Sequence, residues 1–124
     1  MKRKILIVDD EPDSLSFTAG ILESAGFDIV SACDGIDALA LAGSEKPDMV
    51  LLDFMMPIMS GYELCEQIKT NFETKDIPVI CVSSATNAQA LTLQAGASAF
   101  VVKPFSAEEL LAQVRRYLKP GSQD

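Results

Sequence analysis

Five residues that could do chemistry stand directly after short apolar runs of the chain. They are, in order along the sequence, Asp9, Asp10, Asp53, Ser83 and Lys103. If the runs are parallel strands, their carboxyl ends lie at one edge of a sheet, which is where open α/β sheets bind their ligands. The spacing therefore predicts one site made of carboxylates, a hydroxyl and an amine.

Three aspartates at one sheet edge would repel one another unless a cation joined them. An all-oxygen set of ligands favours a hard ion, and two carboxylates with a backbone carbonyl and waters commonly hold Mg²⁺ beside a phosphate. The cluster therefore predicts bound Mg²⁺, with Mn²⁺ as the alternative ion. Lys103 and Ser83 would neutralise phosphoryl oxygens, and Asp53 would be the carboxylate nucleophile that forms an acyl phosphate.

Some of these residues also have an ordinary structural interpretation. An Asp or Ser between a strand and a helix often caps the helix, and Asp10 or Ser83 taken alone fits that role about equally well. Lys103-Pro104 taken alone predicts a turn. Asp53 is different, because Pro57 follows it before a helix can start, so capping does not explain its charge.

The residue types that are missing or rare also narrow the chemistry. The 124 residues contain no histidine, which excludes a histidine general base, a histidine nucleophile and histidine-ligated zinc within this chain. The three cysteines form no C-x-x-C pair, so neither a disulfide framework nor a zinc site is predicted. The loop at residues 9–12 lacks the glycine-rich amide cradle that binds the phosphates of a free nucleotide.

The charge balance restricts the partners. Eighteen acidic residues against ten basic ones give a formal net charge of -8, which argues against nucleic acid or an anionic membrane as the direct partner. No apolar run approaches the ~20 residues that a membrane-spanning helix needs. We therefore expect a cytoplasmic protein.

Short β-branched runs alternate with segments of helical period, and this pattern predicts a parallel α/β sheet. The expected strands are residues 5–8, 29–32, 49–52, 79–82 and 99–102. The expected helices are residues 12–26, 35–42, 61–69, 86–95 and 106–118. The length predicts one domain over residues 1–120, followed by a tail or linker stub at 121–124. A flavodoxin-like, doubly wound order 2-1-3-4-5 would set the first and third strands, with their aspartates, side by side.

Four segments of the chain resemble the signatures of response-regulator receiver domains. They are residues 5–11, 50–57 with Gly61, 79–83 and 100–105. The family has a five-stranded parallel sheet with five helices, in agreement with the count above. The resemblance implies that Asp53 is the phosphorylation site. It also implies that Asp10, Asp53 and the backbone carbonyl of Met55 bind Mg²⁺, with Asp9 acting through water.

The resemblance further implies a conformational switch. Lys103 would pair with the phosphoryl group, Ser83 would move toward it, and Phe100 would turn inward to fill the space left. Without the motif, Phe100 would be interpreted as a core residue of the fifth strand. Lys103-Pro104 would be a cis peptide.

The function implied by the resemblance is that of a phosphoacceptor in a two-component or phosphorelay system. Such a chain is not an enzyme acting on other substrates, since it catalyses only its own phosphoryl transfer and dephosphorylation. The donor would be the phosphohistidine of a sensor histidine kinase or a histidine phosphotransfer protein. A downstream protein would bind the fourth helix, fifth strand and fifth helix.

Two other functions stay open at this point. A receiver-like scaffold could keep the fold and signal without phosphorylation. A metal-dependent phosphatase of the haloacid-dehalogenase type would also use an aspartate nucleophile and Mg²⁺. Its usual D-x-D-x-T signature is absent, because Asp9-Asp10-Glu11-Pro12-Asp13 follows the first strand.

Overall fold

Strands and helices alternate from end to end in a computed structural model of the chain, which describes residues 2–53, 59–84 and 88–118. The strands are β1 (Lys4–Val8), β2 (Asp28–Ala32), β3 (Met49–Asp53), β4 (Val79–Ser83) and β5 (Ala99–Val102). The helices are α1 (Pro12–Ser24), α2 (Gly35–Glu45), α3 (Gly61–Thr70), α4 (Gln89–Gln94) and α5 (Ala107–Tyr117). The tail predicted at 121–124 lies outside the described residues. Among the helices of the described ranges, none is long and apolar enough for a bilayer crossing.

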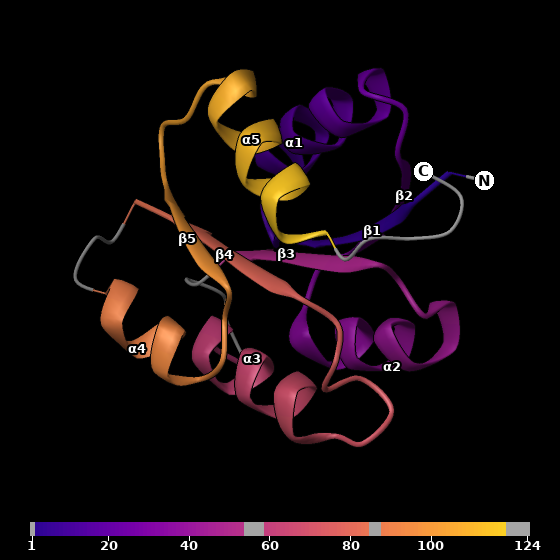
Figure 1. The fold of residues 1–124 in the computed structure, drawn as a ribbon, viewed down its shortest axis with the longest axis vertical. Helices are drawn as coiled ribbons and strands as arrows, with labels where there is room; N and C mark the ends of the chain where they lie inside the picture. Colours follow the sequence, from indigo (N-terminus) through magenta and orange to yellow (C-terminus); the bar gives the residue numbers. More distant parts are fainter. Residues whose placement is uncertain (1, 54–58, 85–87, 119–124) are drawn as a thin grey trace.

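The five strands form one parallel sheet in the order β2-β1-β3-β4-β5 (Figure 1). This confirms the doubly wound, flavodoxin-like order predicted from the sequence. The strand order reverses at β1, which pairs with β2 on one side and with β3 on the other. The carboxyl ends of β1 and β3 therefore meet at the point where sheets of this kind bind ligands.

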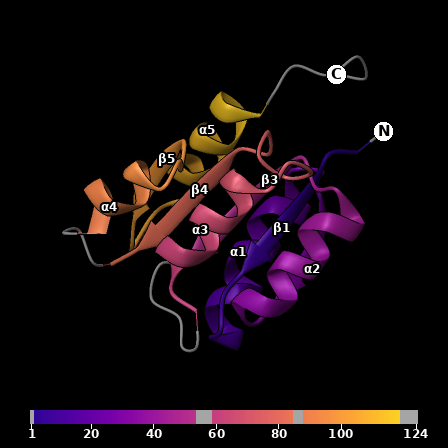
Figure 2. The same ribbon diagram turned by 90° about the horizontal axis from the view of Figure 1, so that it is seen from below.

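Helices cover both faces of the sheet. Helices α1 and α5 lie on one face, and α2, α3 and α4 lie on the other (Figures 1 and 2). Successive strand side chains alternate between the two faces, so that Ile5 and Ile7 join the cluster with Leu22 and Leu110, while Leu6 joins the opposite one. This two-sided burial explains why β1, β3 and β4 are almost continuous apolar runs.

Two local signals in the sequence correctly predict helix ends. Ser106 caps α5 by accepting a hydrogen bond from the Glu109 N–H at 3.1 Å, and the Glu109 carboxylate accepts one from the Ser106 N–H at 3.1 Å. Gly96 follows α4 with φ +108°, a left-handed conformation that favours glycine. The described part of α4 is shorter than the predicted 86–95, and residues 86 and 87 lie outside the described ranges.

The three cysteines are free thiols in different surroundings. Cys33 is exposed, whereas Cys65 and Cys81 are buried between α3 and the sheet. A hydrogen bond with the Cys65 sulfur raises the pKa of the Cys81 thiol well above its usual range, and burial acts in the same direction. That bond lowers the pKa of Cys65, and burial opposes the shift.

We expect Ellman's reagent to modify only Cys33 in the folded protein at neutral pH. Burial denies the reagent access to the other two thiols, and the raised pKa of Cys81 keeps that thiol protonated. The absorbance of the thiolate that the reagent releases measures the number of modified thiols per chain. Cys33→Ser should abolish the native signal, and guanidinium should expose all remaining thiols. If the reagent rapidly modified the folded Cys33→Ser variant, the burial of Cys65 and Cys81 would be contradicted.

Candidate functional site

The pairing of β1 with β3 brings two of the aspartates together. Val8 is the register partner of Leu52, so the next residues, Asp9 and Asp53, stand side by side at the end of the sheet. The Asp9 N–H donates a hydrogen bond to the Ala32 carbonyl at 3.1 Å, which continues the pairing with β2 one residue past the strand. The strand pairing of the sheet thus fixes the backbone positions of Asp9 and Asp53.

Three carboxylates meet at this edge. Asp9, Asp10 and Asp53 each offer one oxygen, and these oxygens all lie within 4.8 Å of one another. Asp9 is 5% exposed, Asp53 is half-buried and Asp10 is exposed, so the cluster is open on the Asp10 side. Clustered oxygen ligands fit a hard divalent cation such as Mg²⁺. Met55, whose carbonyl was expected to join them, lies outside the described residues.

Lys103 reaches this cluster from β5. The Lys103 N–H donates to the Ser83 carbonyl at 2.9 Å, which extends the β4–β5 pairing beyond Val102. The ammonium nitrogen then lies 3.3 Å from Oδ2 of Asp53 and 3.8 Å from Oδ2 of Asp9. The Lys103–Pro104 peptide bond is cis.

The ammonium group compensates only part of the charge. The side chains of Lys103 and Asp53 are 26% and 13% exposed, so salt screens their attraction less than that of a surface pair. Three carboxylates against this one ammonium leave a formal excess of two negative charges. A divalent cation would balance that excess, so the charge count and the ligand type point to the same kind of ion.

Asp10 does not cap the helix that follows it. The N-cap of α1 is Glu11, and its N–H donates to Oδ1 of Asp9 at 3.0 Å. The N-cap of α4 is Ala88, while Ser83 ends β4 and is 1% exposed. The capping interpretation is therefore wrong for Asp10. For Ser83 it stays a prediction, because residues 85–87, between Ser83 and the described part of α4, lie outside the described ranges.

Phe100 lies farther from the carboxylates. It is half-buried in β5, packs against the core on the α2–α4 face, and pairs with Cys81, two residues before Ser83. Strand alternation sets Phe100 and Ser83 on the same face of the sheet. The described position agrees with core packing, and the concerted movement of Ser83 and Phe100 stays a prediction.

Ser14 is a neighbour of the site to which the sequence analysis assigned no role. Its hydroxyl oxygen accepts a hydrogen bond from the Lys103 ammonium group at 3.1 Å. The signal was available, because a residue in the first turn after the first strand must lie over the carboxyl end of that strand. A hydroxyl is common in such turns for other reasons, so residue type alone did not distinguish it.

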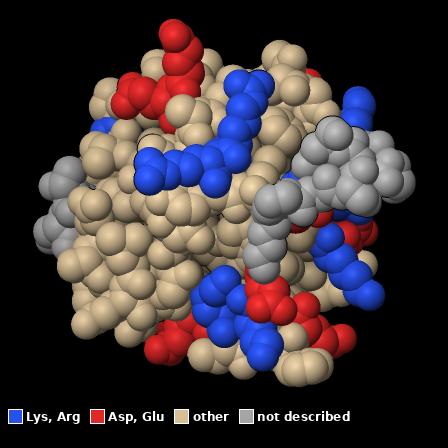
Figure 3. Space-filling view, in the orientation of Figure 1, with Lys and Arg blue, Asp and Glu red and all other residues tan. Residues whose placement is uncertain are grey.

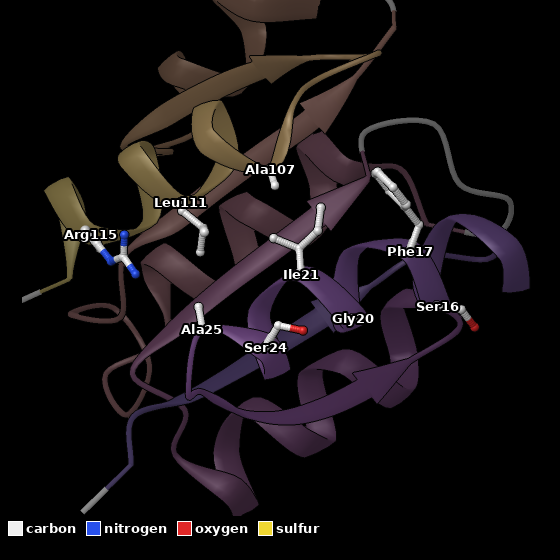
Figure 4. A pocket seen from close by; sticks show the side chains of 9 residues that line it. All are labelled: Ser16, Phe17, Gly20, Ile21, Ser24, Ala25, Ala107, Leu111 and Arg115. Atoms are coloured by element: carbon white, nitrogen blue, oxygen red, sulfur yellow. The ribbon is translucent and has the colours of Figure 1, made fainter.

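Among the hollows formed by described residues, two larger ones lie on the α1–α5 side. The smaller, about 420 Å³, adjoins the site and is lined by Ser14, Phe17, Ser84, Lys103, Pro104 and Phe105. The larger, about 710 Å³, is an open groove between α1 and α5 that also includes Phe17 (Figure 4). Its described lining contains none of the clustered aspartates. The candidate site is therefore the strand-end cluster and not the larger hollow.

We expect saturating Mg²⁺ to raise the melting temperature of the protein. Binding to the folded state alone stabilises it by about 2.7 kcal/mol when the free ion exceeds its dissociation constant about a hundredfold. Differential scanning fluorimetry with and without Mg²⁺ measures the shift.

A matched pair of variants tests where the ion binds. Asp10→Asn should remove most of the shift, because it takes one carboxylate from the cluster. Asp13→Asn makes the same change of charge at an exposed acid in the first turn of α1, outside the cluster, and should keep the shift. Equal shifts in both variants would be inconsistent with a site at the cluster.

The family comparison covers nearly the whole fold. The family model of the response regulator receiver domain matches residues 5–115. This stretch runs from β1 into α5 and contains every residue of the site described above. The match therefore concerns the sheet and the strand-end cluster together.

Curated relatives with similar sequences include transcriptional regulators. The chain is 37% identical over 118 residues to the DNA-binding dual master transcriptional regulator RpaA of Synechocystis, covering 94% of this chain and 49% of RpaA. It is 36% identical over 119 residues to the alkaline phosphatase synthesis transcriptional regulatory protein PhoP of Bacillus subtilis, covering 96% of this chain and 50% of PhoP. The chain thus spans about half the length of the curated relatives it matches.

Similar solved structures include receiver domains from different settings. The receiver domain of sensor histidine kinase PA1611 from Pseudomonas aeruginosa, with a magnesium ion coordinated in its active site cleft, superposes with a TM-score of 0.89 at 27% identity, covering 95% of this chain and 98% of that one. The chemotaxis response regulator CheY4 of Vibrio cholerae superposes with a TM-score of 0.88 at 30% identity, covering 94% and 98%.

Proposed function

The chain belongs to the response regulator receiver domain family of two-component signal transduction, and we propose that it accepts a phosphoryl group on the carboxylate of Asp53. The observation that carries the proposal is the Lys103 ammonium group, 3.3 Å from Asp53 Oδ2, beside two further carboxylates. A lysine and a hard-ion site next to one carboxylate are what phosphoryl transfer to that carboxylate requires.

In the transfer step an Asp53 oxygen bonds to phosphorus while the nitrogen–phosphorus bond of the donor breaks. The product is an acyl phosphate, and the donor imidazole takes up a proton. The Lys103 ammonium neutralises charge on the phosphoryl oxygens as they arrive. A Mg²⁺ ion held by Asp53, Asp10 and, through water, Asp9 would add positive charge at the same place. We propose Mg²⁺ rather than Mn²⁺, since the similar PA1611 receiver domain holds magnesium in its cleft.

The donor histidine must lie outside these 124 residues, because they contain no histidine. A phosphohistidine on a sensor histidine kinase or on a histidine phosphotransfer protein has the required nitrogen–phosphorus bond. The chain therefore acts as a regulatory phosphoacceptor whose catalysis is limited to its own phosphorylation and dephosphorylation.

The surface formed by α4, β5 and α5 is the proposed output face. The sequence of α4 has no charged residue, and the surface over α4 shows no charged side chain in Figure 3. Leu91, Leu93 and Val102 are 49%, 41% and 42% exposed there. Exposed apolar side chains on and beside an uncharged helix favour a protein partner. Ser83 and Phe100, on β4 and β5, connect this face with the phosphoryl site.

Incubation with acetyl phosphate and Mg²⁺ should add one phosphoryl group to the protein. Asp53→Asn should abolish the addition, because an amide is a poor nucleophile and cannot form the acyl phosphate. Intact-protein mass spectrometry measures the product, and hydroxylamine should remove the group, as it does from acyl phosphates.

Asp13→Asn serves as the control, since it changes an exposed acid outside the cluster and should be labelled like the parent chain. Equal labelling of the Asp53→Asn variant would disprove the assignment of Asp53. Turnover of p-nitrophenyl phosphate would support the phosphatase alternative instead. A chain that neither accepts the group nor binds Mg²⁺ in an NMR titration would support the scaffold alternative.

A further inference from the structure

We infer that the Ser14 hydroxyl is a positioning residue that keeps the Lys103 ammonium group at the phosphoryl site. The inference rests on the proposed function of Asp53 and assigns to α1 a part in the transfer step. Ser14 is 89 residues from Lys103 in sequence. The contact therefore joins the first helix to the end of the last strand.

The contacts of the ammonium group define what Ser14 does. The Lys103 nitrogen donates to Ser14 Oγ at 3.1 Å and to Asp53 Oδ2 at 3.3 Å, and it lies 3.8 Å from Asp9 Oδ2. An ammonium group has three N–H donors. Among these three acceptors, the hydroxyl of Ser14 makes the shortest contact and is the one without charge.

An uncharged acceptor matters because the carboxylates acquire other partners during the reaction. A cation at the cluster competes with Lys103 for the oxygens of Asp53 and Asp9, and phosphorylation changes the charge distribution at Asp53. The hydroxyl of Ser14 keeps its acceptor oxygen through both changes. It therefore holds the ammonium beside the phosphoryl oxygens while the carboxylates are occupied.

Lysine benefits from such a contact more than other residues. Its side chain has four rotatable bonds and a high rotamer entropy, and here it is 26% exposed. Restricting the ammonium before the donor arrives lowers the entropy lost in the transition state. The contact should therefore increase the rate of transfer more than it increases the affinity for a small donor.

The beginning of α1 is well anchored, so Ser14 is a stable point of attachment. Oδ1 of Asp9 accepts the N–H of Glu11, the N-cap of α1, and Pro12 occupies the first turn. Ser14 is half-buried, and it lines the hollow of about 420 Å³ next to Lys103. The hydroxyl of Ser14 and the side chain of Lys103 thus line the same hollow beside the strand-end cluster.

The experiment measures labelling of Asp53 by acetyl phosphate as a function of donor concentration. Ser14→Ala should lower the maximal rate about threefold to tenfold, because it removes one hydrogen bond to a charged group at a partly exposed site. The half-saturating donor concentration should change little. Ser14→Thr, which keeps a hydroxyl, should restore most of the rate. Ser16→Ala removes an exposed hydroxyl from the same helix and should leave the rate unchanged.

A second measurement separates positioning from a merely structural role. In the Lys103→Met background, Ser14→Ala should cause no further loss of rate, because its effect passes through the missing ammonium. NMR relaxation of the Lys103 side-chain nitrogen should show greater motion in Ser14→Ala than in the parent, at unchanged melting temperature.

The outcomes distinguish this inference from the proposed function. If the parent chain is not labelled at Asp53, the proposed function is wrong. If the parent is labelled and Ser14→Ala is labelled equally fast or faster, the positioning role alone is overturned. The positioning role is also overturned if Ser14→Ala lowers the rate in the Lys103→Met background by the same factor as in the parent. It is likewise overturned if Ser14→Ala leaves the motion of the Lys103 side-chain nitrogen unchanged.

Discussion

The attraction between the Lys103 ammonium and the carboxylates of Asp53 and Asp9 is the interaction on which the site depends. Parallel strand ends bring three negative charges to within 4.8 Å of one another, and one of them, on Asp9, is nearly buried. The ammonium at 3.3 Å from Asp53 offsets part of this repulsion. Because it offsets only part, the cluster retains a negative charge that a divalent cation would balance, which supports the proposed phosphoryl transfer.

The arrangement of the sheet explains why this positive charge is on a long side chain. Strand β4 separates β3 from β5, and neighbouring strands lie about 4.8 Å apart, so a residue ending β5 starts about 10 Å from β3. A side chain as long as lysine covers much of that gap. The Lys103 N–H bound to the Ser83 carbonyl fixes its starting point, and the Ser14 hydroxyl provides a contact at its far end. Helix α1 and strand β5 thereby meet at the site.

Much of the fold could be predicted from the chain alone. Apolar runs of about five residues between helical segments identify the strands, and the capping box at Ser106 identifies the start of α5, because these signals are local. The carboxylates, Ser83 and Lys103 could be identified because each stands at or just after the end of an apolar run. Helix ends were less accurate, as α2 continues to Glu45 rather than stopping near residue 42. The contact between Ser14 and Lys103 could not be predicted, since the two residues are 89 positions apart.

The sequence by itself determined the kinds of group available: carboxylates, a hydroxyl and a lysine after strands, and no histidine, so that any phosphohistidine must come from elsewhere. It also determined the alternation of strands and helices, because the hydrophobic periodicity of each element depends only on residues close together in the chain. Only the tertiary structure decided which groups meet. The register of β1 with β3 brings Asp9 to Asp53, and the docking of α1 brings Ser14 to Lys103. Such contacts depend on strand pairing and packing between distant segments, which no local pattern encodes.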